Sequence, residues 1–110
     1  MFNKDLIRGT LKPIILSVLK DRGCLYGYEI NKLVSELTTN QIQLTDGALY
    51  PMLHRLEKDG LVTTEIKNVG NRTRKYYKLT QTGNTESSKK VDELMEFIKT
   101  ISLIVKPQKI

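Results

Sequence analysis

Three stretches of the chain place apolar residues three and four positions apart, the spacing that lines one face of an α-helix. They run from Leu6 to Leu19, from Tyr28 to Leu37 and from Leu49 to Leu56. Glycine-containing and polar segments separate these stretches, so each one predicts a helix of its own. A chain of 110 residues can build one hydrophobic core. The three apolar faces are therefore expected to pack against one another.

Capping residues and prolines set the expected helix ends. Pro13 is tolerated only near the start of a helix, so the regular part of the first helix should follow Thr10 as its N-cap. The third helix is expected from about Asp46 to Asp59, with Thr45 or Asp46 as its cap. Pro51 lacks a backbone N–H and predicts a kink or a loosened start in this helix.

The second helix contains two residues whose side chains suggest either packing or a site. Tyr28 belongs to the apolar stripe and is expected in the core. Glu29 is expected to pair with a base such as Arg8 or Lys32. Packing and a surface ion pair therefore account for both residues.

A β-hairpin is predicted after the third helix. Residues 61–66 are rich in β-branched side chains, Gly70-Asn71 favours a turn, and residues 76–79 alternate in polarity. Alternation places one of Tyr76 and Tyr77 toward the core and the other outward. The expected loop of this hairpin is basic and contains Lys67, Arg72, Arg74 and Lys75.

A long C-terminal helix is predicted, capped by Thr80 or Thr82 and ended by Pro107. Its apolar stripe covers two heptads and is widened by Phe97 and Ile104. So long a stripe cannot be buried on so small a core, so pairing with a second copy is favoured over folding back. The expected dimer interface consists of Leu6, Val91, Leu94, Met95, Ile98, Ile101 and Val105.

Helices followed by a basic hairpin predict a mainly α fold, a winged helix-turn-helix over residues 1–80, followed by a dimerisation helix over 81–106 and a tail over 107–110. In this architecture the third helix enters the DNA major groove, and a net charge of +6 favours a polyanionic partner. The side chains expected to face double-stranded DNA are Thr45, Asp46, Ala48, Tyr50, Pro51, His54, Arg55, Lys58, Arg72, Arg74 and Lys75.

Four blocks of sequence, in order and across nearly the whole chain, resemble the PadR family of regulators. They are Arg8-Gly9-Thr10-Leu11, Tyr26-Gly27-Tyr28-Glu29-Ile30, the segment from Gly47 to Val62, and the segment from Arg74 to Gly83. Four blocks at consistent spacing are far more specific than any one of them.

The resemblance implies a cytoplasmic repressor that dimerises through its C-terminal helix, and in several members a small molecule releases the DNA. It assigns DNA contact to the helix around Tyr50, Pro51 and Arg55 and to the wing from Arg72 to Lys75. The single C-terminal helix resembles the shorter members of the family. The chain contains no Trp, whereas drug-binding relatives use one to stack flat ligands, and Ala48 replaces the more frequent Thr or Ser.

No enzyme class finds support in the residues. The sequence shows no Ser-His-Asp set, phosphate loop or paired carboxylate site, and neither a cofactor nor a metal is expected. The lone His54 lacks neighbouring Cys or His at ligand spacing, so an exposed position or a DNA contact is favoured. Cys24 has no partner cysteine and is expected to be a buried structural thiol rather than a redox sensor.

The absence of a secretory signal or an apolar run of about 20 residues predicts a cytoplasmic protein. The predicted function is a sequence-specific transcriptional regulator, a repressor that binds a pseudo-palindromic operator as a homodimer. The alternative is a winged-helix adaptor that binds a protein partner.

Overall fold

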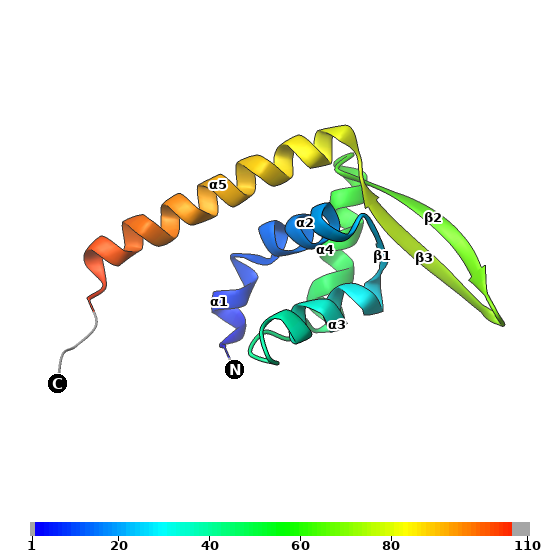
Figure 1. The fold of residues 1–110 in the computed structure, drawn as a ribbon, viewed down its shortest axis with the longest axis horizontal. Coiled ribbons are helices and arrows are strands. Elements are labelled where there is room, and N and C mark those ends of the chain that lie inside the picture. Colours follow the sequence, from blue (N-terminus) through cyan, green and yellow to red (C-terminus); the bar gives the residue numbers. More distant parts are fainter. Residues whose placement is uncertain (1, 107–110) are drawn as a thin grey trace.

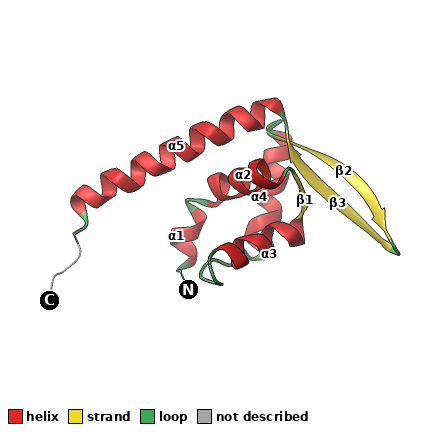
Figure 2. Ribbon diagram, in the orientation of Figure 1, coloured by secondary structure: helices red, strands yellow, loops and turns green. Residues whose placement is uncertain are grey.

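The computed structural model describes residues 2–106, so the expected helix end at Pro107 and the expected tail 107–110 lie outside the described residues. Figures 1 and 2 show mostly helices and one projecting hairpin, which confirms the expected fold class. In chain order the elements are α1 (Lys4–Arg8), α2 (Leu11–Arg22), β1 (Cys24–Tyr26), α3 (Gly27–Leu37), α4 (Asp46–Lys58), β2 (Val62–Val69), β3 (Arg72–Leu79) and α5 (Gln81–Ile104).

The core lies among α2, α3 and α4, where the three apolar stripes meet as predicted. Removing one such side chain from water contributes about 1.5–3 kcal/mol, so this cluster supplies most of the force that holds the helices together. The most completely buried apolar side chains are Ile15, Leu16, Leu19, Ile30, Leu49, Leu53 and Leu56.

Two residues of the second stripe are outside the core, contrary to expectation. Tyr28 is 63 % exposed, because residues two positions apart on a helix point about 200° apart and Ile30 takes the core side. Leu37, the last residue of α3, is equally exposed. The buried face of α3 therefore comprises Ile30 and Val34, with Gly27 at its start.

The first apolar stretch is divided between two helices. α1 ends at Arg8 and α2 begins at Leu11, with a turn between them. Thr10 is the N-cap of α2 and Pro13 is buried in the first turn, as predicted. Leu6 consequently belongs to the short helix α1, and its side chain is exposed.

Side-chain oxygens cap the next two helices. Thr45 Oγ1 accepts a hydrogen bond from the Ala48 N–H at 3.2 Å, which confirms Thr45 as the cap of α4. The Glu29 carboxylate accepts from the Tyr26 N–H at 3.1 Å and thus caps α3, so its expected pairing with Arg8 or Lys32 was wrong. α4 continues through Pro51 to Lys58.

The described strands form an antiparallel sheet in the order β1-β3-β2. β1 was not predicted; its Leu25 pairs with Tyr77 of β3. The hairpin strands extend to the two-residue turn, where Gly70 adopts a φ of +62° that favours glycine. Tyr77 is buried while Tyr76 is half-buried, as the alternation predicted.

α5 starts against the core and then leaves it. Thr80 rather than Thr82 caps the helix, accepting from the Gly83 N–H at 3.0 Å. Figure 1 shows its first half running along α2 and its second half extending past the other helices. Ser87 is fully buried, whereas Ile98 is 49 % exposed, although both lie on the same side of the helix. The described chain is therefore elongated, measuring 57 × 28 × 21 Å.

Candidate nucleic-acid interface

The outward face of α4 carries a continuous stripe of residues with no role in the core. Gly47, Pro51, His54 and Lys58 follow one another at spacings of four, three and four, and all are exposed. Leu49, Leu53 and Leu56 occupy the opposite side and are buried. The stripe is free to contact a partner, as the sequence predicted for this helix.

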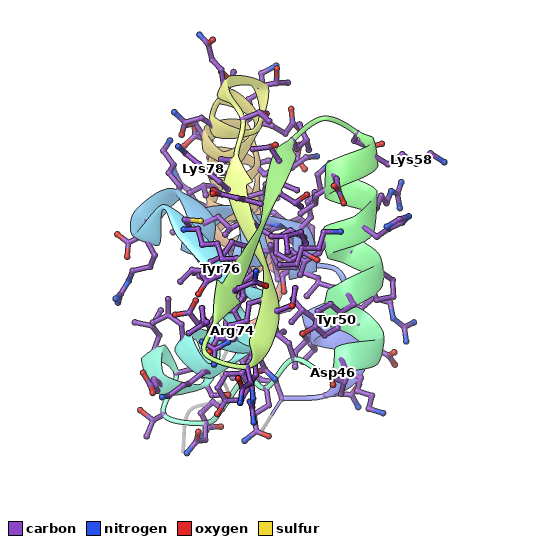
Figure 3. All side chains as sticks on the ribbon, turned by 90° about the vertical axis from the view of Figure 1, so that its right-hand side faces the viewer. Asp46, Tyr50, Lys58, Arg74, Tyr76 and Lys78 are labelled. Carbon is purple, nitrogen blue, oxygen red and sulfur yellow. The ribbon has the colours of Figure 1, made fainter. Side chains whose placement is uncertain are left out.

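Tyr50 lies on the flank of α4 that faces the hairpin, and Figure 3 shows α4 and the hairpin side by side. Its ring packs against Gly27 at the start of α3; a Cβ added at Gly27 would lie 2.5 Å from the Tyr50 hydroxyl oxygen. Asn31 of α3 accepts a hydrogen bond from the Leu44 N–H at 3.1 Å, just before α4 begins. α3 thus fixes the position of α4 at two points.

The other flank of α4 faces α1 and contains Ala48 and Arg55. Arg55 is exposed, as expected of a DNA-contacting side chain. Ala48 is half-buried and packs against the core, so it is less accessible than the sequence suggested. Thr45 and Asp46 are both exposed at the start of the helix, where the Thr45 hydroxyl is engaged in the cap.

Aromatic rings lie beneath three cations of the hairpin, with Lys75 the most distant at 5.7 Å from the centroid of Tyr77. The Arg74 guanidinium lies 4.5 Å from the centroid of the Tyr26 ring, and the Lys67 ammonium lies 4.7 Å from that of Tyr76. The Tyr26 and Tyr76 rings meet edge to face with centroids 5.4 Å apart. Arg74 is therefore held in place, whereas Arg72 beside the turn is exposed.

An ion pair joins the hairpin to α4. The Lys75 ammonium lies 3.2 Å from a Glu57 carboxylate oxygen, and the Thr64 hydroxyl donates to the other oxygen at 3.0 Å. These two hydrogen bonds, that of Thr64 above all, lower the pKa of Glu57 below its ordinary value of 4.5. Lys75, which was expected to meet DNA phosphate, already has a partner on α4.

Sequence reasoning left three contributors out of the expected site. Lys67 was assigned to the hairpin loop without a role, although its register opposite Arg74 places both on one part of the hairpin. Tyr26 was named in a block that resembles the family but in no predicted strand, because a three-residue strand gives little periodicity. Gly47 stood within the expected third helix but was not among the residues expected to face DNA. The signal for Lys67 was an aromatic residue, Tyr76, within diagonal reach on the opposite strand of the predicted hairpin.

The described residues show no alternative chemical centre. Between residues 2 and 106 no group of three or more His, Cys, Asp or Glu side chains could hold a metal ion, and His54 stands exposed on α4. Cys24 is a free thiol in β1 and is half-buried rather than fully buried as expected. None of the helices in this range is both long enough and apolar enough to cross a membrane.

Comparison with known proteins places this arrangement among bacterial regulators. A transcriptional regulator from Clostridium thermocellum is 33 % identical, and its structure superposes with a TM-score of 0.86 over 96 % of this chain and all of that one. The transcriptional regulator Rv3488 of Mycobacterium tuberculosis is 40 % identical over 65 residues, which cover 56 % of this chain and 61 % of that protein.

A third similar structure includes DNA. Bacillus subtilis PadR, in complex with operator DNA, is 25 % identical and matches with a TM-score of 0.65 over 92 % of this chain and 49 % of that longer chain. Residues 15–89, well over half of the 110, match the transcriptional regulator PadR-like family. The family and the fold are those of DNA-binding transcriptional regulators and not of enzymes. The protein belongs to the PadR-like family of transcriptional regulators.

Proposed function

We propose that the protein binds double-stranded DNA sequence-specifically, with α4 in the major groove and the β2–β3 hairpin against the adjoining backbone or minor groove. The observation that carries this proposal is the Glu57–Lys75 ion pair, which ties the hairpin to α4. A helix and a wing held in one fixed relation can contact a duplex together. The operator-bound B. subtilis relative supports the same use of the fold.

The residues of α4 divide by what they can offer a base pair or a phosphate. His54, Arg55 and Lys58 supply donors for base edges or phosphates, and Tyr50 supplies a hydroxyl for a phosphate. Gly47, which has no side chain, and Pro51, whose ring is compact, would let the helix come close to the duplex. The flanking positions Thr45, Asp46 and Ala48 complete the proposed contact face.

On the hairpin, Arg72 and Arg74 are proposed to carry most of the phosphate contact. The Glu57 carboxylate already neutralises Lys75, so this lysine contributes less to attraction at long range and more to holding the wing. Phosphate contacts supply affinity and salt dependence rather than sequence choice.

The protein is further proposed to act as a homodimer through α5. Apolar side chains in the second half of this helix are exposed in the single chain, including Met95, Ile98, Ile101 and Val105. A second copy would cover them. Val91 and Leu94 are already half-buried and would join the interface at its inner end, with Leu6 of α1. Two copies of α4 about 34–36 Å apart would match a pseudo-palindromic operator.

Repression and release by a small molecule are the regulatory part of the proposal. A dimer covering an operator blocks transcription by occupying the DNA. The sequence resemblance to repressors that release DNA on binding a small molecule supports an effector for this chain as well.

Selection from a randomised duplex library, at two salt concentrations, tests the proposal. One enriched inverted repeat is expected. The double variant Arg72→Gln/Arg74→Gln should weaken binding to all sequences and flatten the salt slope by about 1.8, since each phosphate contact contributes about 0.9. Lys89→Gln/Lys99→Gln on α5 removes the same charge away from the proposed face and should bind as the wild type does.

Two outcomes would contradict sequence-specific binding. Salt-sensitive capture of all duplexes without a motif would indicate general DNA coating. Equal, negligible binding by wild type and the wing variant would favour the alternative of a winged-helix adaptor that binds a protein partner.

A further inference from the structure

A groove of about 440 Å³ lies between α1 and the flank of α4 that faces away from the hairpin. Its floor is apolar and includes Ile7 and Leu11. Three exposed cationic side chains stand around it, Lys4 and Arg8 on α1 and Arg55 on α4. Among residues 2–106, no acidic side chain lines the groove. The groove is therefore a positively charged surface directly beside the proposed DNA-contacting face.

The two cations of α1 are available to a partner. Arg8 lies 3.8 Å from Asp5, but both side chains are more than three-quarters exposed, so water competes strongly for this ion pair. Lys4 forms no ion pair with any residue between 2 and 106. Lys4 and Arg8 are four positions apart and share one side of α1, whereas Leu6 lies on another side. α1 can therefore present its cations to the groove and leave Leu6 to the second copy.

The dimensions of DNA place a strand of the duplex beside this groove. An α-helix with its side chains is about 10–12 Å across, and the major groove is about 12 Å wide. A helix in the major groove therefore has a sugar–phosphate strand along each of its flanks. The hairpin lies along one flank of α4 (Figure 3), and α1 lies along the other. The proposed function assigns the hairpin to one strand and leaves the strand beside α1 with Arg55 alone.

We propose that α1 is a further DNA-contacting element, and that Lys4 and Arg8 donate hydrogen bonds to phosphates of the strand that lies along the groove. This proposal rests on the proposed function. The sugars of that strand would cover the apolar floor, and the negative phosphates match the three cations in charge. Gly47 and Pro51 line the groove and also belong to the outward stripe of α4, so the two surfaces are continuous. α1 and the hairpin would thus hold the duplex from both sides of α4.

The double variant Lys4→Gln/Arg8→Gln, titrated against the duplex selected from the library, tests this contact. It should bind about tenfold or more weakly at about 0.1 M salt and flatten the salt slope by about 1.8, since each phosphate contact contributes about 0.9. Lys89→Gln/Lys99→Gln removes the same charge from α5 and should bind as the wild type does. The enriched repeat itself should stay the same, because phosphate contacts carry no sequence information directly.

Neutral methylphosphonates at single positions of the same duplex locate the contact. Substitution of a phosphate that α1 contacts should weaken binding of the wild type but not of Lys4→Gln/Arg8→Gln, because this variant has already lost the contact. The same comparison with Arg72→Gln/Arg74→Gln identifies the phosphates that the hairpin contacts. The two sets of positions should lie on opposite sides of the major groove that α4 occupies.

Three outcomes would contradict the proposal. If Lys4→Gln/Arg8→Gln kept the Kd and the salt slope of the wild type, α1 would not contact the duplex, and the proposed function would still stand. If this variant bound more weakly but stayed sensitive to every methylphosphonate, its charges would act only from a distance. If the wild type bound no duplex, the proposed function would fail, and the contact by α1 with it.

Discussion

At the scale of single residues, the missing Cβ is required by close packing at two glycines and not at a third. At Gly27 it leaves room for the Tyr50 ring, which fixes α4 against α3. At Gly83 it lets α5 approach the backbone of Leu61, because a Cβ there would overlap the carbonyl oxygen. At Gly47 a Cβ would meet open space. The first two positions are constrained by the fold, whereas, beyond its own turn of helix, no atom of residues 2–106 lies within 4 Å of a Cβ at the third.

Gly83→Ala should destabilise the protein by about 3 kcal/mol, because backbone rather than a flexible side chain would have to move. Gly9→Ala is the control, since a Cβ at Gly9 would meet open space and the backbone φ of −68° suits alanine. It should change stability by no more than about 0.5 kcal/mol. Urea unfolding of the two variants measures both values, and equal stability would show that α5 is not seated on Leu61.

Gly47→Ala separates folding from DNA contact at one position. The substitution should stabilise α4 by about 0.5–1 kcal/mol, because alanine favours the helix and finds no neighbour to clash with. Binding to the selected duplex should nevertheless weaken, because the added methyl group would lie where the helix approaches base edges. Thermal unfolding and a duplex titration on the same sample measure the two effects. Unchanged affinity would remove Gly47 from the contact face.

At the scale of elements, the hairpin is held by the pairing of β3 with β1 and by cationic side chains, Arg74 on Tyr26 and Lys75 on Glu57. The ion pair between Lys75 and Glu57 is sensitive to pH. The pKa of Glu57 is lower in the folded chain than its ordinary value of 4.5, so its carboxylate contributes stability above about pH 4.5. That contribution disappears as the pH falls through the folded pKa.

Glu57→Gln should therefore lower the Tm at pH 7 and lose this difference from the wild type near pH 3. Glu36→Gln removes an exposed carboxylate of α3 and controls for the general effect of charge. A Tm difference for Glu57→Gln that stayed constant from pH 7 to pH 3 would show that the carboxylate does not act through its charge. Calorimetry across this pH range provides the measurement.

The helices with a long apolar period and the hairpin with its turn signal were predictable, whereas the three-residue strand β1 was not. The stripes of α2 and α4 were predicted because every third or fourth residue reports the same buried face. β1 was missed because its three residues become a strand only through pairing with Lys78, Tyr77 and Tyr76 of β3. Tertiary contacts also decided the partner of Lys75, since Glu57 lies 18 positions away in the chain.

At the scale of the whole molecule, one face of α5 passes from the core into solvent. Gly83 and Ser87 are buried, Val91 and Leu94 are half-buried, and Ile98 is exposed. The sequence predicted one unbroken stripe for a partner, and the structure instead divides it between the chain's own core and the exposed end. The exposed end of α5 is the surface that the proposed second copy would cover, because apolar surface of this extent is normally covered.

The double variant Ile98→Glu/Ile101→Glu tests whether a second copy covers that end. Both side chains are exposed in the single chain, so the variant should fold, but it should sediment as a monomer at concentrations where the wild type is a dimer. Thr85→Glu/Thr100→Glu adds the same charge on other faces of α5 and should remain dimeric. The monomeric variant Ile98→Glu/Ile101→Glu should bind the inverted repeat about 100-fold more weakly than the wild type, because its subunits would bind the two half-sites independently. If Ile98→Glu/Ile101→Glu remained dimeric, α5 would not be the dimer interface. If the wild type were monomeric and still bound the inverted repeat with full affinity, α5 would not set the spacing between two copies of α4.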